Sequence, residues 1–212
     1  MVCTFGDMKV ANERNIRHLS LEEINTFFES IGEKKFRAKQ VHEWLWQKHA
    51  HSFGDMTNLS KELRQKLGEV FTLPALTVDA TQYSSDGTVK SRFRTHEGHL
   101  IEGVLIPTDE RKTACVSSQI GCSLSCKFCA TGYIDRKRNL NFDEIYDEVV
   151  LINQQSEKVY EKKLTNIVFM GMGEPLLNYK NVMKAIERIT SPDGLGMSPR
   201  RITVSTAGVA KQ

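Results

Sequence analysis

The sequence has no uninterrupted apolar run close to the roughly 18 residues that a membrane-spanning helix needs. Its first residues also lack the charged-then-apolar layout of a secretory signal peptide. The cysteine count is five, an odd number, and most of these cysteines lie close together, which argues against a secreted disulfide framework. We therefore expect a cytoplasmic protein without a membrane partner.

The sequence also has little net charge, no internal repeat of solenoid period and no low-complexity segment. Over 212 residues the formal net charge is +3, with 40% hydrophobic and 26% charged residues, which is ordinary for a globular protein of one large or two small domains. The charge is uneven, because residues 90–140 hold nine Lys/Arg against five Asp/Glu, while residues 141–194 hold six against nine. The basic segment suits a phosphate backbone and equally suits a solvated loop.

What the sequence does have is a cluster of cysteines in the run CVSSQIGCSLSCKFCATG, from Cys115 to Gly132. Cys122, Cys126 and Cys129 follow the spacing Cys-x3-Cys-x2-Cys. Thiolate sulfur selects iron–sulfur clusters, zinc or copper(I) over hard cations. Because a cluster and a structural zinc ion are usually completed by four ligands, three cysteines leave one cluster iron open to a ligand that is not protein.

This loop resembles that of the radical S-adenosylmethionine enzymes, and Phe128 before the third cysteine fits their pattern. The run from Arg111 through GCSLSCKFCATG narrows the resemblance to the dual-specificity RNA methyltransferases of the RlmN and Cfr group. The resemblance implies a 4Fe–4S cluster held by the three cysteines, and S-adenosylmethionine as the second cofactor. From the residues alone a zinc knuckle stays open, with a fourth ligand from Cys115, Cys3 or a histidine.

Helical periodicity dominates the first third of the chain. Three helices are expected, over residues 20–31, 37–49 and 60–70. The first begins at a capping-box pattern formed by Ser20 and Glu23. Residues 1–19 have no clear period and are expected to be a loosely held lead-in. We assign residues 1–75 to an N-terminal helical accessory domain.

The second of these helices carries basic residues at its start and two tryptophans near its end. The basic residues are Lys34, Lys35, Arg37 and Lys39. Beside Trp44 and Trp46 they form a possible RNA-contacting face. The alternative is that the tryptophans are core residues and the lysines are solvated. We favour the core for the tryptophans, and for the lysines both alternatives stay open.

Residues 76–110 alternate polar and apolar residues around a turn signal at Asp86-Gly87. This pattern predicts a β-hairpin region that leads into the main domain. Two further strands are expected over residues 99–106 and 113–118.

After the cysteine loop, strand and helix patterns alternate. The expected elements are a helix capped by Asn141 and Glu144, a buried strand over 164–170, a helix over 179–190 and a strand over 201–205. Such alternation predicts βαβ units and a parallel sheet. The fold class is therefore α/β. The resemblance implies that residues 111–212 are the N-terminal half of a radical S-adenosylmethionine domain, with about three βα units of its barrel.

Ligands of parallel α/β sheets bind at the carboxyl ends of the strands. Three stretches fall at such ends: the cysteine loop, Gly171–Glu174 and Ser205–Gly208. We expect them to meet on one rim. Glycine lets backbone approach a ligand closely, and the carboxylate of Glu174 could hold an ammonium group. A plain strand-to-helix turn is the alternative for Gly171 and Gly173.

The resemblance implies roles for five further side chains or backbone positions. Gly173 and Glu174 match cofactor-contacting residues, and Ser205 matches a serine that contacts the ribose. Glu102, in the apolar run LIEGVLIP, is expected to have a raised pKa, and by resemblance it handles a proton from the adenine intermediate. An outward-facing residue of an edge strand is the alternative. Cys115 matches the second of two redox-active thiols, which releases the methylated base by forming a disulfide, and its alternative is an inert buried cysteine.

The function implied is a radical S-adenosylmethionine RNA methyltransferase, acting as a monomer on C2 of an adenosine in 23S ribosomal RNA and also on transfer RNA. The target base has to leave its stack, so a single-stranded adenosine is expected. Methylation at C8, another radical reaction and a zinc-stapled RNA-binding module without catalysis are the alternatives. No cysteine follows Cys129, whereas the family carries its methyl group on a cysteine near the C-terminus. We therefore expect a truncated chain that does not complete methyl transfer.

Overall fold

The computed structural model describes residues 14–209, and the chain divides into two compact units, Met1–Pro74 and Ala75–Gln212. Cys3, considered as a fourth zinc ligand, lies outside the described residues. Within residues 14–209 no helix is both long and apolar enough to cross a membrane.

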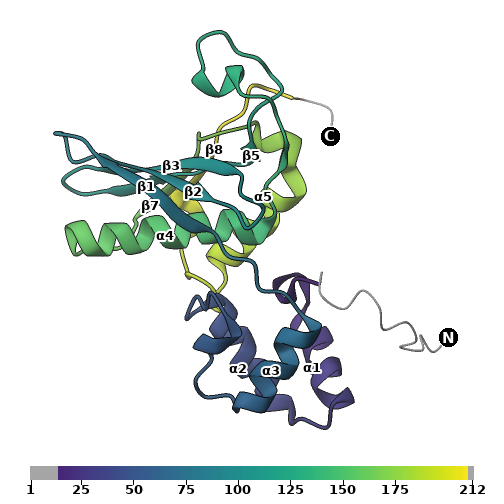
Figure 1. Cartoon of the computed structure of the whole chain (residues 1–212). Coiled ribbons are helices and arrows are strands. Elements are labelled where there is room, and N and C mark those ends of the chain that lie inside the picture. Colours follow the sequence, from purple (N-terminus) through teal and green to yellow (C-terminus); the bar gives the residue numbers. More distant parts are fainter. Residues whose placement is uncertain (1–13, 210–212) are drawn as a thin grey trace. The chain divides into compact units, whose positions relative to one another are not determined.

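The described part of the first unit, residues 14–74, contains three α-helices and two short 3-10 helices (Figure 1). In chain order they are η1 (Ile16–His18), α1 (Leu21–Ser30), α2 (Lys35–Trp46), η2 (Phe53–Asp55) and α3 (Lys61–Val70). The predicted capping box is present, because Ser20 Oγ accepts the Glu23 N–H and the Glu23 carboxylate accepts the Ser20 N–H. The three predicted helices are confirmed. The second ends earlier than expected, since the chain turns at His49 with a φ of 54°.

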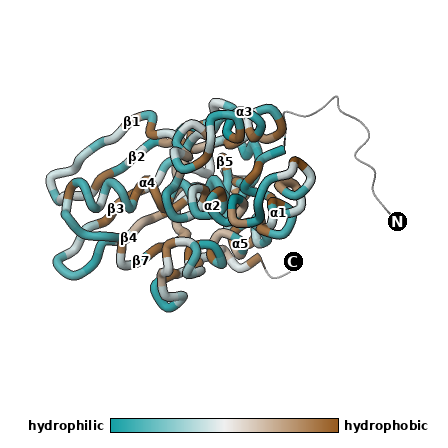
Figure 2. The backbone as a smooth tube through the Cα atoms, turned by 90° about the horizontal axis from the view of Figure 1, so that it is seen from below, coloured by the Kyte–Doolittle hydropathy of each residue, from teal (hydrophilic) through white to brown (hydrophobic). Residues whose placement is uncertain are grey.

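The apolar faces of these helices form a common core, and Figure 2 shows apolar and polar positions interspersed along α1 and α2. Its most buried members include Ile24, Phe28, Val41, Leu45, Trp46, Leu63 and Leu67, each at most 2% exposed. Ile16 belongs to this core at 0% exposure, and its N–H donates to the Thr72 carbonyl. The expectation of a loose lead-in is therefore wrong for residues 16–19, where Ile16 and Leu19 are both buried.

The two tryptophans of α2 differ. Trp46 is a core residue, as expected, with 1% of its surface exposed. Trp44 is half-buried, its indole N–H donates to Asn58 Oδ1 at 2.6 Å, and the Lys48 ammonium lies 4.6 Å from the centre of its ring. The core assignment is thus wrong for Trp44, because the helix turns its polar edge toward the surface.

The second unit is built on a six-stranded sheet in the order β1-β2-β3-β4-β7-β8 (Figure 1). Its strands are β1 (Thr77–Tyr83), β2 (Val89–Arg94), β3 (Leu100–Pro107), β4 (Lys112–Cys115), β7 (Asn166–Phe169) and β8 (Ile202–Val204). The first four pair in antiparallel fashion, which confirms the predicted hairpin, and β4, β7 and β8 are parallel. A separate ribbon joins β5 (Gln119–Ile120) to β6 (Arg138–Asn139).

Two helices make the crossovers between the parallel strands, α4 (Phe142–Tyr160) and α5 (Tyr179–Thr190). Short 3-10 helices lie in the loops: η3 (Ala130–Tyr133), η4 (Pro175–Asn178) and η5 (Pro199–Arg201). Helix α4 lies along one face of the sheet, against β3 and β4 (Figure 1), and it begins with the predicted capping box of Asn141 and Glu144. The strand–helix alternation of a partial α/β barrel is confirmed.

Residue alternation gives the sheet two different faces. The face toward α4 is apolar and buried, with Phe93, Ile101, Leu105, Ala114 and Ile167 all at 0% exposure. On the opposite face, which we call the open face, β2 presents Lys90, Arg92 and Arg94, all exposed. Because side chains alternate along a strand, every second residue of β3 also points to the open face.

Candidate active site

The carboxyl ends of the parallel strands meet as predicted. The segment after β4 is hydrogen-bonded to the loop after β7, since the Gly171 N–H donates to the Val116 carbonyl at 3.0 Å and the Ser118 N–H donates to the Met172 carbonyl at 2.8 Å. The loop after β7 in turn contacts the segment after β8 through Glu174. Three segments distant in sequence therefore form one rim, as expected for a ligand site of a parallel sheet.

Glu174 is the central residue of this rim and is 3% exposed. Its carboxylate accepts the Thr206 hydroxyl at 2.7 Å, the Ala207 N–H at 2.8 Å and the Leu176 N–H at 2.9 Å. Its own N–H donates to Gln119 Oε1 at 2.9 Å. Burial raises the pKa of this carboxyl, but the three hydrogen bonds outweigh burial and bring the pKa below its ordinary value. Glu174 is thus a fixed negative charge on the rim, suited to an ammonium partner.

The two glycines before Glu174 allow a close approach between chain segments. A Cβ atom on Gly171 would lie 2.7 Å from the Val116 backbone. Gly173 has a φ of +94°, and a Cβ atom there would lie 2.5 Å from the Cβ of Gln119. The glycines therefore let the loop pack directly against the segment that leads into the cysteine loop.

Ser205 follows β8 and is exposed. The structure brings its neighbours Thr206 and Ala207, rather than Ser205 itself, into contact with the Glu174 carboxylate. Thr206 and Ala207 belong to the predicted stretch Ser205–Gly208, whereas Gln119 and Asn178 were not predicted as site residues. Asn178 is buried and donates to the carbonyls of Ser118 and Leu140, at 2.8 Å each. For Gln119 the only signal was its place in the polar run CVSSQ, just after the strand predicted over residues 113–118.

The cysteine loop is closed at its base by the β5–β6 ribbon. Gly121, just inside the ribbon, has a φ of +76°, and a Cβ atom there would lie 2.3 Å from the Asp135 carbonyl oxygen. Arg138 of the ribbon donates to both carboxylate oxygens of Glu144 at 2.7 Å and to Glu97 at 2.7 Å. The loop therefore projects from a base that is held to α4 and to the β2–β3 turn.

The loop cysteines are all half-buried and free. The Cys129 N–H donates to the Cys126 carbonyl at 3.1 Å, and the Gly132 N–H donates to the Cys129 carbonyl at 2.9 Å. Hydrogen bonds to the sulfur, the backbone N–H of Thr131 first, lower the pKa of the Cys129 thiol. Among residues 14–209 no three Cys, His, Asp or Glu side chains converge closely enough to hold a metal ion. The donor set itself, three accessible thiols on one loop and one of them acidified, fits a soft metal centre.

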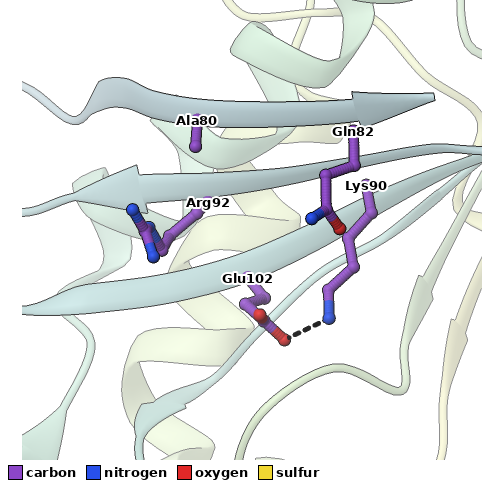
Figure 3. Close-up of a pocket in the computed structure, with 5 residues that line it drawn as sticks. All are labelled: Ala80, Gln82, Lys90, Arg92 and Glu102. Carbon is purple, nitrogen blue, oxygen red and sulfur yellow. Dashed lines mark ion pairs between the residues drawn. The ribbon is translucent and has the colours of Figure 1, made fainter.

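Glu102 and Cys115 lie on the open face of the sheet. Glu102 is exposed and its carboxylate forms an ion pair with the Lys90 ammonium at 2.9 Å (Figure 3). Val104 pairs with Cys115, and Glu102 is two residues from Val104, so the two candidate residues point to the same face from neighbouring strands. Ala80, Gln82, Lys90, Arg92 and Glu102 together line a pocket on this face (Figure 3).

These positions correct two expectations about Glu102. Its surroundings are polar rather than apolar, because strand alternation sends Ile101 and Gly103 to the buried face instead. The alternative, an outward-facing residue of an edge strand, is confirmed for the outward direction of Glu102 and wrong for the edge, since β3 lies inside the six-stranded sheet. For Cys115, burial raises the pKa of the thiol. None of the cysteines at 115, 122, 126 and 129 forms a disulfide, so the expected disulfide is not seen in the described part of the chain.

Comparison with known proteins gives two family matches along the chain. The ribosomal RNA large subunit methyltransferase N-terminal domain matches residues 14–73, and the radical SAM superfamily matches residues 116–211. Each match falls within one of the two compact units.

Individual relatives extend over nearly all of the chain. It is 59% identical over 199 residues to a protein of Christiangramia forsetii named probable dual-specificity RNA methyltransferase RlmN, covering 94% of this chain and 56% of that protein. It is 43% identical to the dual-specificity RNA methyltransferase RlmN of Geotalea uraniireducens, covering 93% and 56%. The crystal structure of a radical SAM methyltransferase from Sphaerobacter thermophilus matches with a TM-score of 0.81 and 38% identity, covering 92% of this chain and 57% of that one. The chain thus spans about half the length of the curated relatives it matches.

Proposed function

Because the chain belongs to the RlmN family of radical S-adenosylmethionine enzymes, we propose that the complete protein is an RNA methyltransferase acting on a ring carbon of adenosine. The observation that carries this proposal is the rim, where the cysteine-bearing segment, the Gly171–Glu174 loop and the Ser205–Gly208 segment are joined by hydrogen bonds. The three segments bring, in turn, cysteine thiols for a cluster, the Glu174 carboxylate for the ammonium group of S-adenosylmethionine, and the Ser205 hydroxyl for its ribose. By family membership we propose C2 as the carbon, and 23S ribosomal RNA and transfer RNA as substrates.

We assign the cofactors to the residues that fit them. Cys122, Cys126 and Cys129 would hold a 4Fe–4S cluster, which supplies the electron that radical S-adenosylmethionine chemistry needs when it is bound. Glu174 offers an ionised carboxylate for the ammonium group of S-adenosylmethionine, and Gly173 lets the backbone come close. Ser205, exposed next to Thr206, would contact the ribose.

The open face of the sheet would receive the target base. Glu102 and Cys115 point to that face from adjacent strands, so a carboxylate and a thiol are both available to one bound nucleotide. Glu102 would hold the proton that leaves the adenine ring, with Lys90 beside it as the counter-charge. Cys115, whose pKa is raised by burial, would stay a thiol until its proton is taken up. An adenosine reaches such a face only when it is unstacked.

The helical unit, residues 14–74 of which are described, would contact the RNA backbone. Lys34, Lys35 and Lys39 are exposed at the start of α2, and the half-buried Trp44 lies further along the same helix. Basic side chains of this kind supply most of the affinity for a phosphate backbone. We also propose a monomeric, cytoplasmic protein, as the composition and the family suggest. The inability of this chain alone to complete methyl transfer stays a prediction.

Anaerobic reconstitution with iron and sulfide tests the cofactor assignment on this chain. We expect a brown protein with broad absorption near about 400 nm, as cluster thiolate chemistry produces. Cys126→Ala should abolish the colour and the bound iron, whereas Cys115→Ala, which changes a cysteine outside the cluster spacing, should keep both. A colourless chain that binds zinc instead would overturn the proposal in favour of a metal-stapled RNA-binding module.

The reaction itself is tested on the full-length protein. With S-adenosylmethionine and a ribosomal RNA fragment, mass spectrometry should find a methyl group on C2 of adenosine. A product methylated at C8, or no methylated base with a loaded cluster, would contradict the proposed substrate chemistry.

A further inference from the structure

Glu148 is a buried carboxyl group that the proposed function leaves without a role. It lies on α4 with 0% of its surface exposed, and both of its side-chain oxygens are within hydrogen-bond distance of the Ser117 N–H, at 3.0 and 3.2 Å. No ion pair to Glu148 is present among residues 14–209. Burial raises its pKa well above the ordinary value, against a smaller lowering by the Ser117 hydrogen bond. Burying a carboxyl group without an ionic partner destabilises the folded chain, so Glu148 is a candidate for a role other than packing.

The Glu148 carboxyl group lies against the sheet at a glycine, Gly103. Gly103 of β3 lies opposite Glu148, and a Cβ atom on Gly103 would lie 2.6 Å from Glu148 Oε1 and 2.9 Å from a methyl group of Ile152. Gly103 has no positive φ, so its backbone does not explain the glycine. The missing side chain at Gly103 therefore makes the space in which the Glu148 carboxyl reaches Ser117.

Ser117 is the junction of three segments. Its N–H donates to Glu148, its hydroxyl donates to the Glu102 carbonyl at 2.7 Å, and its hydroxyl oxygen accepts the Met172 N–H at 2.9 Å. Ser117 is 0% exposed, so water does not compete for these contacts. One buried serine thus connects β3, the segment after Cys115 and the loop that ends in Glu174.

We propose that Ser117 and Glu148 are positioning residues of the candidate active site: Glu148 fixes the backbone of Ser117, and the Ser117 hydroxyl holds the Gly171–Glu174 loop against the strand that carries Glu102. This inference rests on the proposed function, because it assigns the pair a role toward the cofactor that this loop would bind. Both residues are 0% exposed, so the proposal gives neither of them a direct contact with cofactor or substrate. Their effect on both is transmitted through the Met172 N–H and the Glu102 carbonyl.

Four variants of the full chain test this proposal. Ser117→Ala removes the hydroxyl and keeps the backbone contact with Glu148. Ser156→Ala is its matched control, since Ser156 is also 0% exposed and donates one short hydrogen bond, to the Lys162 carbonyl at 2.6 Å, at the far end of α4. Glu148→Gln keeps a neutral acceptor for the Ser117 N–H, whereas Glu148→Leu removes the acceptor at similar size.

The first measurement is amide hydrogen exchange, which needs no cofactor. In Ser117→Ala the Met172 N–H loses its acceptor, so its exchange should be about tenfold faster, while Ser156→Ala leaves it unchanged. The second is S-adenosylmethionine affinity of the reconstituted chain at measured iron content. Ser117→Ala and Glu148→Leu should weaken binding about tenfold with iron content unchanged, and Glu148→Gln should behave like the parent chain.

Two results would overturn the positioning role. One is an unchanged Met172 exchange rate in Ser117→Ala, and the other is a Glu148→Gln chain that loses affinity as strongly as Glu148→Leu. If Glu148→Leu does not fold, the comparison of Ser117→Ala, Ser156→Ala and Glu148→Gln decides. A parent chain that takes up no iron would contradict the proposed function instead, and the exchange rates would still decide whether Ser117 holds the loop.

Discussion

At the scale of single residues, three ionisable groups near the rim are driven in different directions by their surroundings. Hydrogen bonds keep the Glu174 carboxylate ionised, and they acidify the Cys129 thiol. Burial without a counter-charge raises the pKa of Glu148 well above its ordinary value. The rim therefore carries its negative charge where a cofactor ammonium would bind, whereas burial disfavours a charge on Glu148 behind it.

Glu148→Gln should change how stability depends on pH. The folded pKa of Glu148 lies above its unfolded value near 4.5, so the free energy of unfolding of the parent chain falls as pH rises from that value through the folded pKa. Glutamine has no such loss, so its stability advantage over the parent chain should grow as pH rises above about 4.5. Urea unfolding at several pH values measures this. Glu157→Gln, on the exposed side of the same helix, should show no such growth.

Gly173→Ala should be more damaging than a glycine replacement at another left-handed position. Gly98 has a φ of +88°, and beyond its chain neighbours no atom lies within 4 Å of the position that a Cβ atom would take, so Gly98→Ala costs only backbone strain, about 1–2 kcal/mol. At Gly173 the collision with Gln119 adds at least about 1 kcal/mol. Equal losses in urea unfolding of the two variants would mean that the loop does not pack against Gln119.

At the scale of elements, the β5–β6 ribbon decides how firmly the cysteine loop is held. Arg138 binds Glu144 through two parallel hydrogen bonds, a geometry that lysine cannot reproduce. Arg138→Lys should therefore make residues 121–137 about fivefold more sensitive to limited proteolysis. Arg111→Lys, at an exposed arginine outside the ribbon, is the control and should leave the cleavage rate as in the parent.

Most elements could be predicted because their signals are local. The capping boxes at Ser20 and Asn141 and the apolar stripes of the helices lie within a few residues, and the structure confirms them. The meeting of three segments at the rim could be predicted because ligand sites of parallel sheets form at the carboxyl ends of the strands. Segment 16–19 and Trp44 were misjudged because partners far along the chain, Thr72 and Asn58, decide their environment.

The environments of the site residues also depend on partners that are distant in the sequence. The environment of Glu102 was misjudged because an apolar sequence neighbourhood does not reveal which face of a strand a residue occupies. Ser117 and Glu148 could not be found at all, since they lie 31 residues apart and meet only when α4 packs on β4. Thr206 and Ala207 were close to a predicted residue, but only the fold shows that they contact Glu174.

At the scale of the whole molecule, we propose a different role for each of the two units. The helical unit carries exposed lysines and would contact RNA, and the sheet unit carries the rim. Replacing Lys34 and Lys39 together by alanine should weaken RNA binding about tenfold and reduce its dependence on salt. The same change at Lys61 and Lys66, which are exposed on α3, should have a smaller effect in the same titration. Equal effects would mean that α2 has no special role.

The proposed radical chemistry requires an open iron in the cysteine loop that takes S-adenosylmethionine. Electron paramagnetic resonance of the reconstituted and reduced chain, with and without S-adenosylmethionine, tests this directly. We predict a cluster signal whose shape changes when S-adenosylmethionine is added, because the ligand binds the iron that the three cysteines leave open. A cluster signal that stays the same, or a chain that binds zinc and gives no signal, would contradict the binding of S-adenosylmethionine at an open iron.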